Sequence, residues 1–290
     1  MSPRTARATP LAVRFLRIAR LTLHLFRGLW IVFTRYGRLP LAGRHRELQR
    51  WSRQLLAILN VRVHRHDVPE AWPPRCMVVL NHVSWLDIFA VFAVLPGVFV
   101  AKSEIARWPL VGTLVASVGT LFIERGSRGH ARRMNQDIAA KMNAGEIVCI
   151  CPEGTTTDGR ELKPFHTALL QPALDAQGAL LPLALRYVDG HGAQSVIPAY
   201  VGDQSLVASI WAIASAPRLG VELHFAPALD TVGRTRRELA RECEAAIAER
   251  LGVRPPHKAS GTRGDPPAAP PTTHSPTRSR YPAPADRAVS

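Results

Sequence analysis

The 290-residue sequence predicts an α/β fold, a largely parallel sheet flanked by helices, with an N-terminal amphipathic two-helix segment before it. Short apolar segments of strand length alternate along the chain with longer segments of helical period, which is typical of parallel sheets. The strand-like runs at 76–80 and 147–151 are apolar without alternation, as expected of strands buried on both faces. A basic segment with apolar residues at helical spacing predicts the helices that precede the sheet.

The elements follow one another in a regular order. We expect strands at residues 61–66, 76–80, 97–101, 119–124, 147–151, 180–187 and 219–225. We expect helices at residues 11–33, 43–59, 85–94, 105–117, 129–143, 165–176, 205–215 and 234–251. In parallel sheets, sites gather beyond the carboxyl ends of the strands, so the residues that directly follow these strands are the first candidates for a functional site.

The composition divides the chain into three regions. Residues 1–59 form the basic amphipathic helices, and residues 60–253 form the α/β domain. Residues 254–290 are rich in Pro, Ser, Thr and Arg, which predicts a disordered tail. The four cysteines lie in apolar or helical surroundings and lack the spacing of a zinc site, so we expect reduced cysteines and no metal.

The first expected helix, at 11–33, has two different faces. Its basic residues recur at spacings of three and four, at Arg14, Arg17, Arg20, His24 and Arg27. The opposite face is apolar and consists of Leu11, Phe15, Ile18, Leu25, Phe26, Leu29, Trp30 and Phe33. This pattern predicts a helix lying in the lipid interface, with anionic membrane lipids as partners. The alternative is an ordinary amphipathic helix docked on the core, whereas the arginines disfavour a membrane-spanning helix.

The net charge of +15 also narrows the class of partner. Residues 1–50 hold eleven arginines against the single acid Glu47, so the expected partner is an anionic surface, either phospholipid or nucleic acid. A nucleic-acid-binding protein would gather basic residues and stacking aromatics on one folded surface. Here the cations stand opposite a face that is apolar except for Thr22, which favours lipid and argues against nucleic acid.

The motif Asn81-His-Val-Ser-Trp-Leu-Asp87 directly follows the expected strand 76–80. A histidine can take a proton from a hydroxyl at neutral pH, and a carboxylate in reach holds its ring in the right tautomer. The motif also fits a capping box, in which Ser84 begins a helix and Asp87 complements its N-terminus. The two interpretations are compatible, because capping at Ser84 leaves His82 on the turn before the helix.

Three further blocks follow in order: Leu121-Phe-Ile-Glu-Arg-Gly126, Ile147–Cys151 running into Pro152-Glu-Gly-Thr155, and the proline-containing strand Leu180–Arg186. Together, the four blocks resemble the glycerolipid acyltransferase family, the bacterial 1-acylglycerol-3-phosphate acyltransferases in particular. The resemblance implies transfer of a fatty acyl group from a thioester to the glycerol hydroxyl of 1-acylglycerol-3-phosphate, which gives phosphatidic acid. The alternative acceptor is another lyso-lipid, such as a lyso-ornithine lipid.

In this chemistry His82 is the expected general base and Asp87 orients it. An acceptor phosphate needs cationic and N–H donors, for which Arg125, Gly154 and Thr155 are the candidates. The resemblance adds Lys102 and Glu153 to the acceptor site, although a carboxylate by itself repels phosphate. No cofactor is expected, since acyl-coenzyme A or acyl-acyl carrier protein serves as the donor substrate. Such an enzyme would work at the cytoplasmic face of the bacterial inner membrane.

Two departures from the family pattern concern the acceptor headgroup. The third block usually continues with Arg-Ser after Glu-Gly-Thr, whereas Thr156 and Thr157 follow here, and Arg160 is the nearest arginine. His166 stands where a lysine is common. The expected catalytic pair is unaffected by either change.

Overall fold

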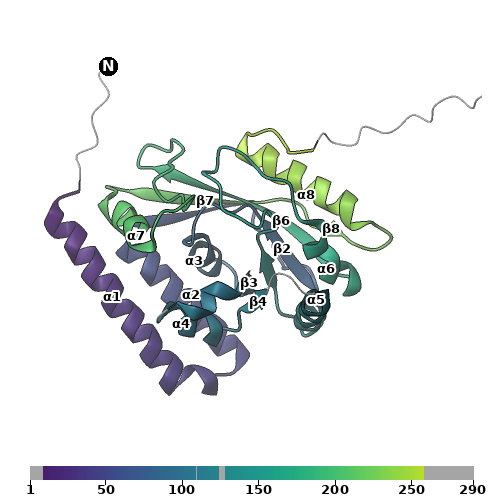
Figure 1. Cartoon of the computed structure of the whole chain (residues 1–290), viewed down its shortest axis with the longest axis horizontal. Helices are drawn as coiled ribbons and strands as arrows, with labels where there is room; N and C mark the ends of the chain where they lie inside the picture. Colours follow the sequence, from purple (N-terminus) through teal and green to yellow (C-terminus); the bar gives the residue numbers. More distant parts are fainter. Residues whose placement is uncertain (1–8, 109, 124–127, 258–290) are drawn as a thin grey trace, which may run out of the picture. The chain divides into compact units, whose positions relative to one another are not determined.

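The computed structural model describes residues 9–108, 110–123 and 128–257, and within these ranges it contains one eight-stranded sheet (Figure 1). The strands are β1 (Val61–His66), β2 (Cys76–Leu80), β3 (Val98–Lys102), β4 (Leu121–Ile123), β5 (Val148–Ile150), β6 (Ala179–Asp189), β7 (Leu219–Phe225) and β8 (Leu229–Asp230). The bounds of β1, β2 and β7 are those predicted from the sequence. Strand β8 is not predicted, because two residues are too few to show a hydrophobic pattern.

The strand order is β1-β7-β6-β2-β5-β3-β4, with β8 paired to β6. Neighbouring strands from β6 to β4 are parallel, while β7 and β8 run antiparallel to β6. The largely parallel sheet is therefore confirmed, with an antiparallel pairing at β6 that the sequence does not reveal. The carboxyl ends of β2, β5, β3 and β4 lie at one edge of the sheet, so the segments that follow them approach one another there.

Helices cover both faces of the sheet. One face packs against α1 (Leu11–Thr34), α2 (Leu41–Ile58), α3 (Asp87–Phe92), α4 (Val111–Ser117) and α7 (Leu206–Ser215). The other face packs against α5 (Arg128–Asn143), α6 (Gln171–Asp175) and α8 (Arg236–Leu251). Short 3-10 turns lie at η1 (Tyr36–Arg38), η2 (Ser103–Arg107) and η3 (Thr167–Leu170).

Two helices that the sequence predicts as continuous are each divided. The predicted helix 105–117 becomes η2 and α4, because Trp108 is extended at the residue before a proline. The predicted helix 165–176 becomes η3 and α6, and Pro172 stands in the first turn of α6. In both places a proline sets the boundary between the two pieces.

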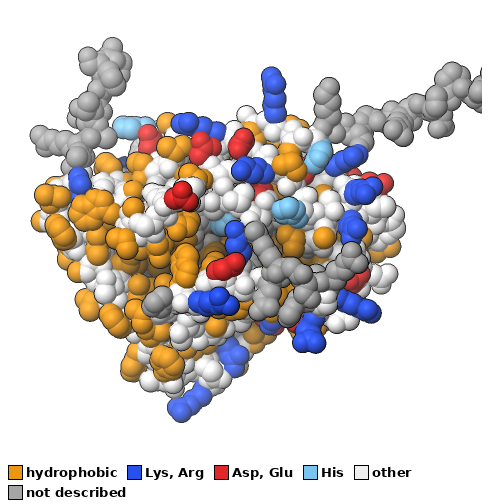
Figure 2. Space-filling view, in the orientation of Figure 1, with side chains coloured by type: hydrophobic (Ala, Val, Ile, Leu, Met, Phe, Trp, Pro, Cys, Tyr) orange, Lys and Arg blue, Asp and Glu red, His pale blue; other side chains and the backbone are white. Residues whose placement is uncertain are grey.

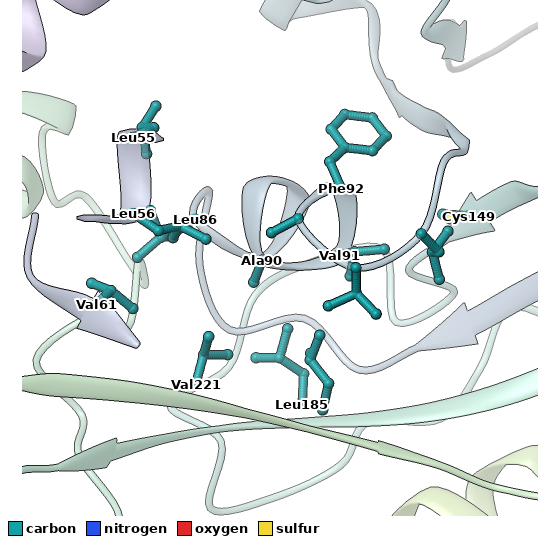
Figure 3. Packing of buried hydrophobic residues seen from close by; sticks show 14 of the residues in the cluster. Leu55, Leu56, Val61, Leu86, Ala90, Val91, Phe92, Cys149, Leu185 and Val221 are labelled. Atoms are coloured by element: carbon teal, nitrogen blue, oxygen red, sulfur yellow. The ribbon is translucent and has the colours of Figure 1, made fainter. Parts of the chain in front are cut away.

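The core consists of two layers of apolar side chains, one on each face of the sheet. Alternate residues of β2 enter the two layers, and all five are buried, which explains the apolar run without alternation. Figure 3 shows Leu86 and Ala90, from the segment that carries the motif, packing toward Leu185 of β6 and Val221 of β7. The turn after β2 is therefore supported by buried side chains that pack against the sheet.

The basic side of α1 contacts the protein. The Arg17 guanidinium donates hydrogen bonds of 2.8 and 2.7 Å to the carbonyls of Ala214 and Ala216 at the end of α7. Arg27 bonds to the Gln54 side chain of α2 at 2.6 Å. His24 is buried against Trp51, with ring centroids 4.5 Å apart. These side chains fix α1 to α2 and α7 and do not form a free cationic face.

The outer side of α1 is apolar and exposed. Phe15, Leu23, Phe26, Trp30 and Phe33 have between 54% and 73% of their surface exposed. Figure 2 shows hydrophobic side chains gathered on the left of the molecule, where Figure 1 draws α1. Among the described helices, none is both long and apolar enough to cross a membrane.

Candidate active site

The turn that follows β2 is held in place by its first residue. The Asn81 side chain donates a hydrogen bond to the carbonyl of Leu185 at 2.9 Å and accepts one from the Leu185 N–H at 2.7 Å. Both atoms of its amide therefore pair with β6, the neighbouring strand. The backbone turns away from the sheet immediately after this anchor, and His82 is the first residue on the turn.

The structure brings His82 and Asp87 together. Nδ1 of His82 lies 2.8 Å from Oδ2 of Asp87, which is the first residue of α3. The carboxylate is fully buried, whereas 24% of the His82 side chain remains exposed. A ring held at Nδ1 by a carboxylate leaves Nε2 as the nitrogen that can accept a proton. The pair therefore has the geometry expected of a general base and the group that orients it.

Asp87 accepts four hydrogen bonds in all. Besides His82, Oδ2 accepts from the backbone N–H groups of Val83 at 2.8 Å and Ser84 at 3.0 Å. Oδ1 accepts from the hydroxyl of Tyr187 at 2.7 Å. With both oxygens engaged by these donors, the buried carboxylate is held in one orientation.

The capping box predicted at Ser84 forms only in part. The helix begins at Asp87 and not directly after Ser84, and no side chain caps it. The Ser84 hydroxyl instead accepts a hydrogen bond from the Leu86 N–H at 3.3 Å. Because Ser84 is fully buried and its hydroxyl is engaged in this turn, its role is structural.

Charge and burial act in opposite directions on His82. Burial disfavours the imidazolium, but Cys151 and the Asp87 carboxylate outweigh it and hold the pKa of His82 well above its ordinary value. Burial also raises the pKa of Cys151, whereas the neighbouring His82 lowers it. The Asp87 carboxylate is bonded directly to the ring and strengthens His82 as a base.

Glu153 follows β5 and binds the backbone of the turn. Its Oε1 accepts from the N–H of His82 at 2.7 Å, and its Oε2 accepts from the N–H of Lys163 at 2.9 Å. The side chain is 4% exposed, and burial raises its pKa to about 7. Both oxygens are thus engaged in linking the β5 loop to the residue that carries the base.

The other predicted acceptor residues lie along the same edge. Gly154 has a φ of +68° in a tight turn, and a Cβ there would come within 2.9 Å of the His166 ring. Thr155 is exposed on the same turn, with no helix beginning at it. Lys102 is exposed at the end of β3, separated from β2 by β5. Arg125 lies outside the described residues.

Two neighbours of the pair are not predicted from the sequence. Tyr187 is buried on β6, and Cys151 stands next to His82 at the end of β5. A signal for Tyr187 exists, since a tyrosine in an apolar strand needs a partner for its hydroxyl. Nothing in the sequence identifies that partner as a residue 100 positions away.

A pocket of about 530 Å³ opens beside this turn. It is lined by Thr155, Thr156, Thr157, Asp158, Arg160, Glu161, Lys163, Val201 and Gly202. The N–H of Thr157 donates to the carbonyl of His82 at 2.8 Å, and the N–H of Tyr200 donates to the carbonyl of Val83 at 2.9 Å. Both loops that line the pocket are therefore bonded to the turn that carries the base.

Comparisons with known proteins identify the family of the chain. The profile of the family described as Acyltransferase matches residues 60–186. The chain is 36% identical to a 1-acyl-sn-glycerol-3-phosphate acyltransferase of Neisseria gonorrhoeae, over 73% of this chain and 82% of that protein. It is also 36% identical to the lyso-ornithine lipid O-acyltransferase of Pseudomonas aeruginosa, over 70% of this chain and 78% of that protein.

The fold has a solved counterpart. The crystal structure of the 1-acyl-sn-glycerophosphate acyltransferase PlsC from Thermotoga maritima matches with a TM-score of 0.60 and 19% identity. The match covers 82% of this chain and 96% of that one, and it shows the fold. With the profile match and relatives above 30% identity, the chain belongs to the acyltransferase family of lipid-synthesising enzymes.

Proposed function

We propose that this enzyme transfers a fatty acyl group from an acyl thioester to the free hydroxyl of a membrane lyso-lipid. The observation that carries the proposal is the His82–Asp87 contact of 2.8 Å at the carboxyl end of β2. An alcohol attacks a thioester only weakly until its proton is removed, and a histidine oriented by a buried carboxylate can remove it. The thiol of the donor then leaves, and no covalent enzyme intermediate is required.

Asp87 and Glu153, which both bond to His82, have roles in this proposal. Asp87 holds the ring and stabilises the cation that forms when His82 takes the proton. Glu153 holds the backbone of His82 through its N–H. The roles of Lys102, Gly154, Thr155 and Arg125 in acceptor binding stay predictions. Arg125→Ala is expected to raise the KM for a phosphate-bearing acceptor while leaving kcat nearly unchanged.

Two acceptors fit this chemistry. One is 1-acylglycerol-3-phosphate, with phosphatidic acid as product, as the names of the Neisseria relatives suggest. The other is a lyso-ornithine lipid, as the names of the Pseudomonas and Rhizobium relatives suggest. Either acyl-coenzyme A or acyl-acyl carrier protein can supply the thioester. Purified protein given each acceptor with each donor, with lipid products identified by mass, tests the proposal, and the absence of product in all four mixtures would refute it.

The membrane contact is also part of the proposal. Phe26, Trp30 and Phe33 point outward from α1, whereas Arg17 and Arg27 bond to the protein. Peripheral attachment would therefore use burial of apolar surface, which contributes about 25 cal/mol per Å². Anionic lipids are then not required for attachment, contrary to what the sequence pattern suggests. The cytoplasmic face of the membrane stays the expected location.

A further inference from the structure

The pocket beside His82 carries both signs of charge. Asp158 and Glu161 bring two carboxylates to its lining, and Arg160 and Lys163 bring two cations, so the described lining has no net charge. The remaining lining includes three threonines, whose hydroxyls are neutral donors and acceptors. Such a pocket differs from a phosphate site, in which cations outnumber carboxylates.

The charges are only partly engaged with one another. Asp158 accepts a hydrogen bond from the N–H of Arg160 at 2.9 Å, and their charged groups are 3.8 Å apart. Among the described residues, the side chains of Glu161 and Lys163 have no ion-pair partner. One carboxylate and one ammonium thus line the same pocket, available to a ligand that carries the opposite charges.

Thr156, the second residue after Gly154, adds no charge to the pocket. The hydroxyl of Thr156 donates to the carbonyl of Tyr200 and so ties the two loops of the pocket together. The Thr156 hydroxyl therefore stabilises the pocket by linking its two loops. A phosphate monoester placed in the pocket would face Asp158 and Glu161 without an excess of described cations, and like charges brought together disfavour binding.

Resting on the proposed acyl transfer, we infer that this pocket binds the headgroup of the acceptor and that this headgroup carries both an ammonium and a carboxylate. The ammonium pairs with Glu161 and Asp158, and the carboxylate pairs with Lys163 and Arg160. The pocket is bonded to the His82 turn through Thr157, so a headgroup held there places its lipid near the base. An amino-acid lipid such as a lyso-ornithine lipid has this chemistry, whereas 1-acylglycerol-3-phosphate does not.

The test compares two acceptors in the full-length enzyme and in two variants. Lyso-ornithine lipid and 1-acylglycerol-3-phosphate are presented in the same detergent micelles with a saturating acyl thioester, and kcat and KM are measured for each. Glu161→Gln removes one exposed carboxylate from the pocket and keeps its shape. The matched control is Glu70→Gln, an exposed carboxylate between β1 and β2, at the opposite edge of the sheet from His82.

We expect the wild type to prefer the lyso-ornithine lipid in kcat/KM. Glu161→Gln should raise the KM for that lipid about tenfold, the scale of one charge-assisted hydrogen bond, and should leave the KM for 1-acylglycerol-3-phosphate unchanged or lower. Glu70→Gln should change neither value.

Turnover of 1-acylglycerol-3-phosphate alone would overturn the headgroup assignment and leave the acyl transfer standing. An equal effect of Glu161→Gln on both acceptors, or no effect on either, would also overturn it. If neither lipid is acylated, the proposed function fails and the headgroup assignment fails with it.

Discussion

The hydroxyl of Tyr187, near the carboxyl end of β6, donates a hydrogen bond of 2.7 Å to Oδ1 of Asp87, whereas His82 contacts Oδ2 of the same carboxylate. Both residues are buried, and 100 positions of sequence separate them. The bond takes up part of the charge of the carboxylate. It therefore influences how strongly Asp87 stabilises a proton on His82, although Tyr187 does not contact the reacting atoms.

Tyr187→Phe should move the pH dependence of the reaction upward. Without the hydroxyl, more negative charge stays on the Asp87 carboxylate, which raises the pKa of His82 still further above its ordinary value. A base acts when neutral, so the acidic limb of kcat/KM should shift to higher pH. The variant should also lose about 1.5–3 kcal/mol of unfolding free energy in urea. An unchanged pH profile with lowered stability would assign Tyr187 to the core alone.

Asp87→Asn should shift the acidic limb of kcat/KM to lower pH. Removing the carboxylate lowers the pKa of His82, so the neutral ring is populated at lower pH than in the wild type. The rate should nevertheless fall by roughly three to four orders of magnitude, because the ring loses the partner that fixes its tautomer. A pH–rate profile measured from pH 5 to 9 checks both effects. An acidic limb that moves to higher pH in this variant would contradict the proposed effect of the Asp87 carboxylate on His82.

The face of α1 allows a test of membrane attachment. Phe26→Ser with Trp30→Ser removes two side chains that are 54% and 61% exposed, so folding should be unaffected. Binding to neutral phosphatidylcholine vesicles should weaken at least about tenfold, since burying one such ring contributes about 1.5–3 kcal/mol. Wild-type binding should persist in 1 M salt. Attachment that needs anionic lipid and is released by salt would show that the arginines contact headgroups.

The arginines of α1 that bond to the protein are expected to affect stability and not membrane binding. Arg17→Met removes two hydrogen bonds to the end of α7, so the unfolding free energy should fall by about 1–3 kcal/mol. Arg20→Met on the same helix is the matched control. Because Arg20 is exposed, this substitution should change the unfolding free energy by less than about 0.5 kcal/mol. Vesicle binding should be equal in both variants. A loss of vesicle binding in Arg17→Met alone, at normal stability, would contradict this account.

Much of the fold follows from local pattern. Strand β2 is visible as an apolar run, and β7 as apolar residues at every second position. The helices are visible as 3.6-residue periods, because burial on one or both faces imposes these patterns directly. The breaks at Trp108 and Pro172 show where a continuous periodicity is misleading. A single proline ends one helical segment or starts the next without changing the hydrophobic pattern on either side.

The features that the sequence does not reveal depend on contacts between distant residues. The periodicity of α1 shows two faces but not which one the protein covers, and Arg17 finds its acceptors almost 200 positions away. The partnership of Tyr187 with Asp87 likewise arises only when β6 pairs with β2. The pocket is formed by two loops, and loop conformations carry no period from which their proximity could be predicted.

The central claim is that His82 takes the proton from the acceptor hydroxyl. The most direct measurement is the single-turnover rate of acyl transfer by His82→Ala, at saturating donor and acceptor, in protein whose thermal unfolding matches the wild type. Asp87 keeps three other donors in this variant, so the turn should retain its shape. General base catalysis predicts a loss of at least about a hundredfold. A rate within twofold of the wild type would contradict it.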